Sequence, residues 1–256
     1  MGISRQAHYQ WQHRRADDAA KCERVVDLVK EKRLRQPRLG TRKLHHLLRP
    51  ALAAEGLSLG RDALFDLLRW NRLLVPTRRA YHKTTNSHHR FRRHPNLLKA
   101  GPEQVRAEAS EQVWVADITY LPTRRRCAYL SLVTDAYSRK IVGYHVHDGL
   151  HTAEVSQALK MALKGRQGSR PLIHHSDRGI QYCAHEYQAI HQKYGLICSM
   201  TDGYDCYQNA LAERVNGILK EEFLLQIPED LDQAQGMVRQ SITIYNTERP
   251  HCSLQL

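Results

Sequence analysis

An apolar, β-branched segment near the middle of the chain constrains the fold more than any other feature. Val113–Tyr120 reads VWVADITY, which is typical of a buried strand. Further strands are predicted at Tyr129–Thr134 and Ile141–Val146, and the three form an antiparallel meander. Helices and strands then alternate: a helix at Thr152–Lys164, a strand at Pro171–His175, a helix at Ala184–Tyr194, a strand at Leu196–Met200, and helices at Gln208–Phe223 and Asp232–Asn246. This order predicts an α/β domain in which helices flank a mixed sheet.

The charge of the chain is divided unevenly between its two parts. Residues 1–112 hold 24 basic and 11 acidic side chains, whereas residues 113–256 hold 15 of each, so the first part carries the whole net charge of +13. An excess of one sign over a whole region favours nucleic acid as the partner. We find no signal peptide and no apolar run of the ~20 residues that a membrane span needs. We therefore expect a cytoplasmic, nucleoid-associated protein with no membrane partner.

Three helices are predicted in the basic part, at residues 17–33, 40–48 and 61–74. Thr41 is expected to cap the second helix, and Trp70 is expected to lie on the apolar face of the third. A turn at residues 55–60 separates the last two helices, which gives the outline of a helix-turn-helix motif.

The domain organisation follows from these patterns. We expect a helical DNA-binding region at 1–75, a basic linker at 76–110 and a catalytic core at 111–256. The linker contains prolines, arginines and two aromatic residues, Tyr81 and Phe91. It is either a solvated tether or a segment that follows a phosphate backbone.

Three acidic residues in the core region stand out. Asp117 lies inside an apolar strand, where an ionised carboxylate needs a compensating cation or a cleft. Asp177 follows the strand at Pro171–His175, and Glu213 lies on the helix at Gln208–Phe223. The spacings are 59 and 35 residues. If the three converge, their hard oxygen atoms suit two Mg²⁺ or Mn²⁺ ions about 4 Å apart. A buried ion pair or an ordinary turn aspartate is the alternative for each acid taken alone.

The helical count places Glu213 on a polar stripe with Asn209, Asn216 and Lys220, opposite the apolar face of the same helix. Such a stripe suits a DNA-binding surface that contacts phosphate. A plain solvated face is the alternative.

Four ordered motifs carry a family resemblance. Trp114–Tyr120, His175–Tyr182, Asn209–Arg214 and Tyr245–His251 together resemble the OrfB-type transposases of frameshifting bacterial insertion sequences. The catalytic core of this family is similar to that of retroviral integrases, which have an RNase H-like fold. The resemblance extends over nearly the whole chain.

The resemblance also implies roles for single residues. Asp117, Asp177 and Glu213 match the catalytic D-D-E triad that binds two divalent ions, Mg²⁺ or Mn²⁺. Lys220 matches a basic position that contacts the DNA end. Arg249, in the last motif, is expected to contact DNA or to close the core.

The implied function is transposition, in which the enzyme cuts and joins double-stranded DNA at element ends and target. The implied partners are further copies of the chain on DNA and an upstream-frame protein, or a fusion to it. Relatives usually continue beyond the position of Leu256, so we expect a C-terminally short core. Two alternatives remain open: a nuclease that only hydrolyses, and a catalytically dead or truncated remnant that only binds DNA.

Overall fold

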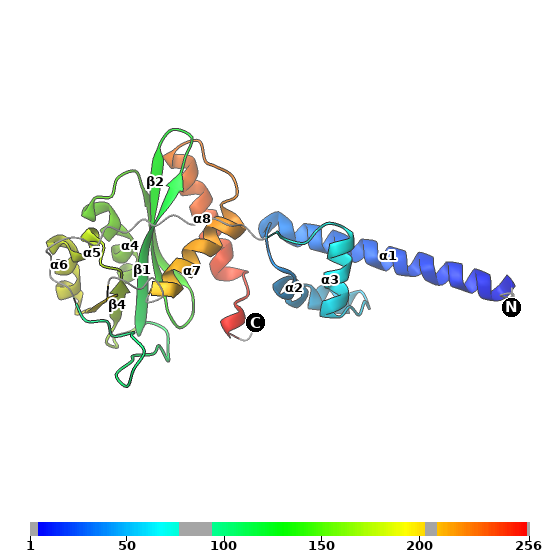
Figure 1. The fold of residues 1–256 in the computed structure, drawn as a ribbon, viewed down its shortest axis with the longest axis horizontal. Helices are drawn as coiled ribbons and strands as arrows, with labels where there is room; N and C mark the ends of the chain where they lie inside the picture. The colour runs from blue at the N-terminus through cyan, green and yellow to red at the C-terminus, as the bar shows by residue number, and fades with distance from the viewer. Residues whose placement is uncertain (1–4, 77–93, 203–208, 255–256) are drawn as a thin grey trace. The chain divides into compact units, whose positions relative to one another are not determined.

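The computed structural model describes the backbone of residues 5–76, 94–202 and 209–254, and side chains from Asp18 onward except Ser253. The chain divides into two compact units. The first comprises Met1–Arg78 with Arg249–Leu256, and the second comprises Arg79–Glu248. Among the described residues, the first contains three α-helices and the short 3-10 helix η3 (Cys252–Leu254), and the second contains the sheet (Figure 1).

The helical unit is built from α1 (Arg5–Arg35), α2 (Thr41–Ala54) and α3 (Arg61–Trp70). These helices bury one cluster of aliphatic side chains, made of Val25, Leu28, Val29, Leu39, Leu44, Leu48, Leu52, Leu64 and Leu68. All three predicted helices are therefore present, because each sequence places leucine or valine at helical spacing.

Two details of this unit differ from the predictions. Thr41 is the first residue of α2 rather than its cap, because Gly40 occupies the N-cap position. No side chain caps this end of the helix. Trp70 is 89% exposed because α3 ends there, so its side chain is not part of the apolar face. The prediction for each of these two residues was wrong.

A five-stranded mixed sheet forms the centre of the second unit, with strand order β3-β2-β1-β4-β5. Strands β1 (Val113–Pro122), β2 (Cys127–Asp135) and β3 (Ile141–His147) are antiparallel. Strands β4 (Ile173–Ser176) and β5 (Ile197–Met200) run parallel to β1. This order and sense confirm the RNase H-like fold that the sequence predicted.

Helices cover both faces of the sheet (Figure 1). Three of them lie on one face: α4 (Thr152–Gly165), α5 (Ile180–Cys183) and α6 (His185–Tyr194). On the other face lie α7 (Ala210–Ile218), the π-helical turn η2 (Leu219–Phe223) that continues it, and α8 (Leu231–Thr247). Each face buries its own hydrophobic core, so the strands are covered on both sides.

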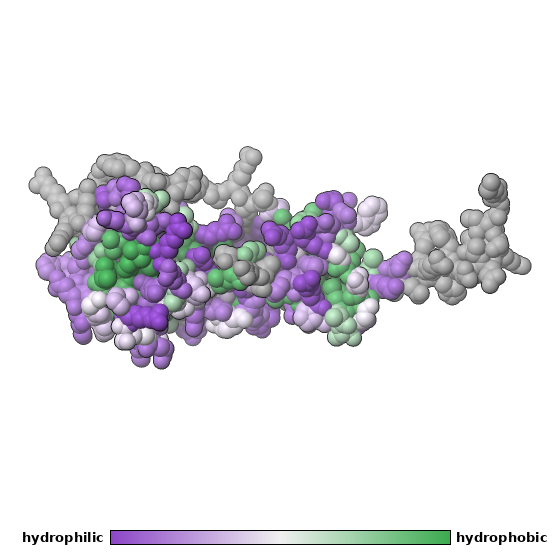
Figure 2. All heavy atoms as spheres, turned by 90° about the horizontal axis from the view of Figure 1, so that it is seen from below, coloured by the Kyte–Doolittle hydropathy of each residue, from purple (hydrophilic) through white to green (hydrophobic). Residues whose placement is uncertain are grey.

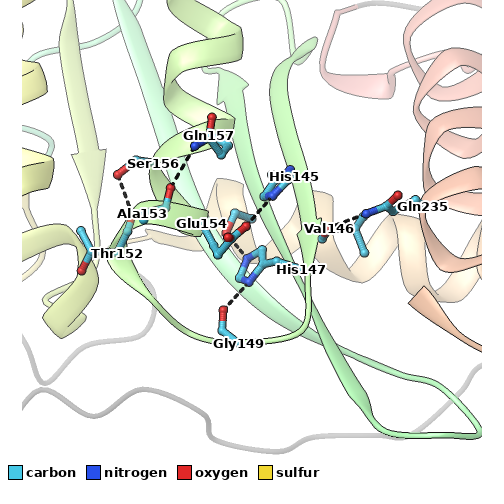
Figure 3. A network of polar contacts seen from close by, with 11 residues as sticks. His145, Val146, His147, Gly149, Thr152, Ala153, Glu154, Ser156, Gln157 and Gln235 are labelled. Carbon is cyan, nitrogen blue, oxygen red and sulfur yellow. Dashed lines mark hydrogen bonds and ion pairs between the residues drawn. The ribbon is translucent and has the colours of Figure 1, made fainter. Parts of the chain in front are cut away.

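Helix α4 packs unusually close to β3. A Cβ atom added to Gly143 would lie 2.0 Å from the carbonyl oxygen of Ala158, so only glycine fits there. Polar contacts also join β3 to α4 and to the loop before it (Figure 3): His145 Nε2 lies 2.8 Å from Glu154 Oε2 on α4, and His147 Nδ1 donates to the carbonyl of Gly149 in the loop over 2.6 Å. The backbone contact and these side chains together fix α4 on the sheet.

Part of the segment predicted as a linker belongs to the second unit. The backbone N–H of Met200 donates to the carbonyl of Pro95 (3.2 Å), and that of Leu97 donates to Ser199 Oγ (3.0 Å). Leu98 and Val105 pack against the cluster around Val113 and Val115. The basic stretch 77–93, with Tyr81 and Phe91, lies outside the described residues.

Two buried histidines, His174 on β4 and His191 on α6, make the stability of the protein sensitive to acid. His191 Nε2 lies 3.2 Å from His174 Nδ1, and the hydroxyl of Tyr187 lies 3.4 Å from His174 Nε2. Burial lowers the pKa of His191 to about 4. Burial, with the neighbouring His191 and His175, lowers the pKa of His174 well below its usual value. The folded state therefore holds both imidazoles neutral.

We expect the free energy of unfolding to fall as the pH drops below about 6.5. Each of these histidines takes up a proton on unfolding, which costs about 1.4 kcal/mol of stability per pH unit between its unfolded and folded pKa values. Urea unfolding across this range measures the slope. His191→Gln should flatten it, while His185→Gln, at an exposed position of the same helix, should leave it unchanged. Equal slopes for wild type and His191→Gln would contradict the assignment.

The surface of both units is mainly hydrophilic on the face drawn in Figure 2, where apolar side chains form separate, smaller areas. Among the helices of the described residues, none is both long and apolar enough to cross a membrane.

Candidate active site

Asp117 lies in β1 at the point where its parallel neighbour ends. The ladder between β1 and β4 includes Val113, Trp114 and Val115, and stops there. The next carbonyl along β1, that of Ala116, accepts a hydrogen bond from Asn209 Nδ2 (3.0 Å) instead. A carboxylate is tolerated in this apolar strand because the edge of β1 opens beside it. The sequence analysis named a cleft as one explanation for a carboxylate at this position. The end of the β1–β4 ladder at Val115 is consistent with that explanation.

The register of the parallel pair places Asp177 near Asp117. His175 pairs with Val115, and two further residues along each chain bring the two aspartates level. The turn after β4 fixes the carboxylate of Asp177, because the backbone N–H of Gly179 donates to its Oδ1 (2.9 Å). A Cβ on Gly179 would lie 3.0 Å from this same oxygen, so glycine allows the turn to close tightly.

Helix α7 brings Glu213 to the same face of β1. Glu213 is exposed in the first turn of the helix, and Asn216 lies one turn further along. Asn216 Nδ2 donates to Asp117 Oδ2 over 2.8 Å. The helix that carries Glu213 is thus fastened to the strand that carries Asp117.

The polar stripe predicted on this helix is only partly exposed. Asn209 is 5% exposed and Asn216 is 4% exposed, so the prediction that both lie on an open face was wrong. The physical reason is that β1 offers a carbonyl and a carboxylate to this side of α7, and the two amides bind them. Buried amides are common where the partner surface is itself polar.

The charges of Asp177 and Glu213 act on the carboxyl group of Asp117. The pKa of Asp117 is raised to about 7, mainly by burial and then by the charge of Asp177, with a smaller contribution from Glu213, while the hydrogen bond from Asn216 lowers it. Burial also raises the pKa of Tyr182 well above its usual value, and the charges of Asp117 and Asp177 contribute. Sequence reasoning assigned no role to Tyr182, although it lies inside the motif that contains Asp177.

Lys220 belongs to the same neighbourhood. Burial lowers the pKa of its ammonium group, and the charge of Asp117 partly restores it. Lys220 lies in η2, where the helix changes from α to π geometry. This change sets the direction of the side chain, and the regular helical count used for the prediction does not include it.

The motif near the C-terminus fastens α8 to the sheet. Asn246 forms two hydrogen bonds with the backbone of Ile141, each of 2.9 Å, and the hydroxyl of Tyr245 donates to the carbonyl of Arg139 over 3.0 Å. Arg249 is 6% exposed. Tyr245 and Asn246 therefore close the core at the start of β3.

The donor set at Asp117 suits a hard divalent cation, although the carboxylates are not drawn tightly together. Within the described part of the chain, no three histidine, cysteine or acidic side chains are close enough to hold a metal ion. The buried Oδ1 atoms of Asn209 and Asn216 also have no hydrogen-bond partner among the described residues. The site thus has negative charge and unused acceptors that a cation with its water shell would satisfy.

Removing the charge of Asp117 should stabilise the metal-free protein. A carboxyl with a raised pKa favours folding when protonated, so stability falls as the pH rises from about 4 through about 7. Asp117→Asn avoids this cost, and we expect its Tm at pH 8 to exceed that of wild type by about 3 °C or more.

The comparison at pH 5 is the control, since Asp117 is protonated there and the two Tm values should converge. Scanning calorimetry in EDTA measures both. A lower Tm for Asp117→Asn at pH 8 would contradict the electrostatic description.

An RNase H-like sheet with acidic side chains at the end of its central parallel pair defines an integrase-type core. Two sequence-family models agree with this class: both describe an integrase core domain, and they match residues 107–206 and 194–256.

Relatives identify the family. An uncharacterized 31 kDa protein of insertion element IS600 from Shigella sonnei is 37% identical over 99% of this chain and 92% of its own length. The transposase InsF of insertion sequence IS3A from Escherichia coli is 31% identical over 87% of this chain and 76% of its own. The chain belongs to the OrfB-type transposases of insertion sequences.

A solved structure of a viral enzyme also aligns with part of the chain. The HTLV-2 integrase catalytic core domain, determined in complex with magnesium, aligns with 56% of this chain and 92% of its own, at 20% identity and a TM-score of 0.46.

Proposed function

We propose that this transposase cuts DNA at the ends of its element and joins them to a target by metal-dependent transesterification. Asp117, Asp177 and Glu213 form the catalytic site and hold two Mg²⁺ or Mn²⁺ ions. The observation that carries the proposal is the register of β1 and β4, which brings Asp177 level with Asp117, while the hydrogen bond from Asn216 ties the helix that carries Glu213 to Asp117. Polynucleotidyl transfer is the activity that the integrase core domain implies.

When bound, divalent ions would stabilise the attacking and leaving oxygens of a phosphodiester. The residues of the chain do the positioning. Gly179 holds the carboxylate of Asp177 in its turn, and Asn216 holds that of Asp117. Because Asn216 lies one turn from Glu213, the same hydrogen bond sets the distance of α7 from β1. Lys220 offers a cation beside Asp117 that can bind a phosphate of the DNA end.

The remaining partners follow from charge and family. Residues 1–75 would form the DNA-binding region, 76–110 the basic linker and 111–256 the core, with Arg249 a further candidate for DNA contact. The excess of basic side chains before residue 113 supports duplex DNA as the partner of this region. Work on two element ends and a target calls for more than one copy of the chain, together with the upstream-frame protein or a fusion to it.

The function is tested with the full chain and a labelled duplex that carries an element end. We expect cleaved and strand-transfer products in Mg²⁺ or Mn²⁺, and neither in EDTA. Hydrolysis without strand transfer would indicate a nuclease, and binding without cleavage would indicate a remnant. Cleavage that survives EDTA unchanged would contradict the metal site.

A further inference from the structure

The helical unit contains a basic hollow on α2 and α3. Its volume is about 320 Å³, and it is lined by Arg42, His45, His46, Arg49, Arg61 and Asp62. On α2, Arg42, His46 and Arg49 follow one another at intervals of four and three residues, so they lie on one face of the helix. Three arginines therefore meet around a hollow with only one carboxylate in its lining.

The two helices differ in the charge that they expose. The sequence of α2 contains two arginines, a lysine and no acidic residue. In α3, by contrast, two arginines are matched by two aspartates, and each arginine pairs with one of them: Arg61 with Asp62 (2.9 Å) and Arg69 with Asp66 (2.5 Å). Helix α3, the second helix of the helix-turn-helix outline, is thus neutral overall, and the excess positive charge lies on α2.

Arg42 and Arg49 are exposed cations that have no carboxylate partner in the part of the chain that the structure describes. Among the described residues neither forms an ion pair, whereas Arg24 in the same unit pairs with Glu55. His45 lines the hollow, and its ring is fixed in place because Nε2 lies 2.9 Å from the carbonyl of Leu59 in the turn before α3. Two unpaired guanidinium groups on one helical face, beside a fixed wall, suit the bidentate recognition of phosphate.

We propose that this hollow binds the phosphate backbone of duplex DNA, so that α2 and the first residue of α3 position the duplex without reading its sequence. The inference rests on the proposed function, since it assigns DNA binding to named side chains of the helical unit. Arg42 and Arg49 contact phosphates, Arg61 assists them, and Asp62 weakens the contact. Because each aspartate of α3 pairs with an arginine, α3 offers no excess positive charge to the backbone, and the duplex is directed toward α2.

The test is a mobility shift of the full chain on duplex DNA in EDTA, repeated from 50 to 200 mM salt. Binding is thus measured without cleavage, and a failure of the catalytic proposal does not affect it. Each phosphate contact contributes about 0.9 to the slope of log K against log salt. The double variant Arg42→Ala/Arg49→Ala should lose about 1.8 of this slope and bind roughly sixtyfold more weakly at 100 mM salt. The loss should be equal for an element end and an unrelated duplex.

Three further variants make the result specific to the hollow. Arg69→Ala removes an exposed arginine of α3 outside it and should leave affinity within about twofold. Arg42→Lys/Arg49→Lys keeps the charge and should retain most of the slope. Asp62→Asn removes the one carboxylate and should tighten binding several-fold, a gain that misfolding cannot mimic. Unchanged affinity and slope for the double alanine variant, or weaker binding of Asp62→Asn, would overturn the proposal.

Discussion

Replacing Glu213 by glutamine should slow DNA cleavage roughly a thousandfold. The substitution keeps the side-chain volume and removes one charge from the group around Asp117. If three carboxylates hold the ions, the loss of one displaces the others, and about 4 kcal/mol of transition-state stabilisation corresponds to a factor of this size. Single-turnover cleavage and strand transfer on a labelled element end measure the effect.

Matched variants separate chemistry from folding. Asp117→Asn and Asp177→Asn should lose as much as Glu213→Gln, and double variants should be little worse than single ones because the acids act as a unit. Glu221→Gln changes an exposed glutamate that follows on the same helix and should cleave like wild type. Near wild-type cleavage by folded Glu213→Gln would contradict the triad.

Replacing Gly143 by alanine should destabilise the second unit on the order of 4 kcal/mol. The new Cβ would lie 2.0 Å from the carbonyl oxygen of Ala158 and 2.9 Å from the backbone nitrogen of Ala162. Both atoms belong to the backbone of α4, which cannot move aside like a side chain, so the helix must separate from β3. Such overpacking costs at least ~1–3 kcal/mol, and a backbone clash adds to it.

Urea unfolding of Gly143→Ala measures this loss. The control is Gly165→Ala at the end of α4, where an added Cβ meets nothing within 4 Å. This variant should unfold within about 1 kcal/mol of wild type. If Gly143→Ala unfolds at the wild-type midpoint, the close packing of α4 on β3 is not present in solution.

The sequence predicted the sheet well because its strands are marked by local chemistry. Val113–Tyr120 is apolar and β-branched, and the structure extends that strand only to Pro122. The short parallel strands were also found, although their neighbours could be determined only from the fold. Pairing is a long-range property, and no local pattern states that β4 lies beside β1.

Helix faces were predicted less well. The helical count placed Asn209 and Asn216 opposite the apolar face of the helix and therefore in solvent. It could not show that β1 would offer them a carbonyl and a carboxylate. The count also assumed a regular α-helix beyond Ile218, whereas the chain continues as π-helix through Lys220. The burial of the two amides arises from tertiary contacts that a single helix does not encode.

Asp117 was singled out because a charged side chain inside an apolar strand is costly and therefore informative, whereas Asp177 and Glu213 were assigned with it from their spacing and from the family resemblance. Gly179 and Tyr182 were not given roles, since a glycine and a tyrosine near a turn have many ordinary explanations. Their positions beside Asp177 and Asp117 become meaningful only once the register of β1 and β4 is known.

The most direct measurement is a crystal structure of the full chain grown with Mn²⁺, with anomalous differences used to locate the ions. If the three acids form the metal site, we expect Mn²⁺ between Asp117 and Asp177. Glu213 should then turn inward to complete the ligands, and Asn216 should remain bound to Asp117. Mn²⁺ found only elsewhere in the crystal, with Glu213 directed away from the two aspartates, would contradict it.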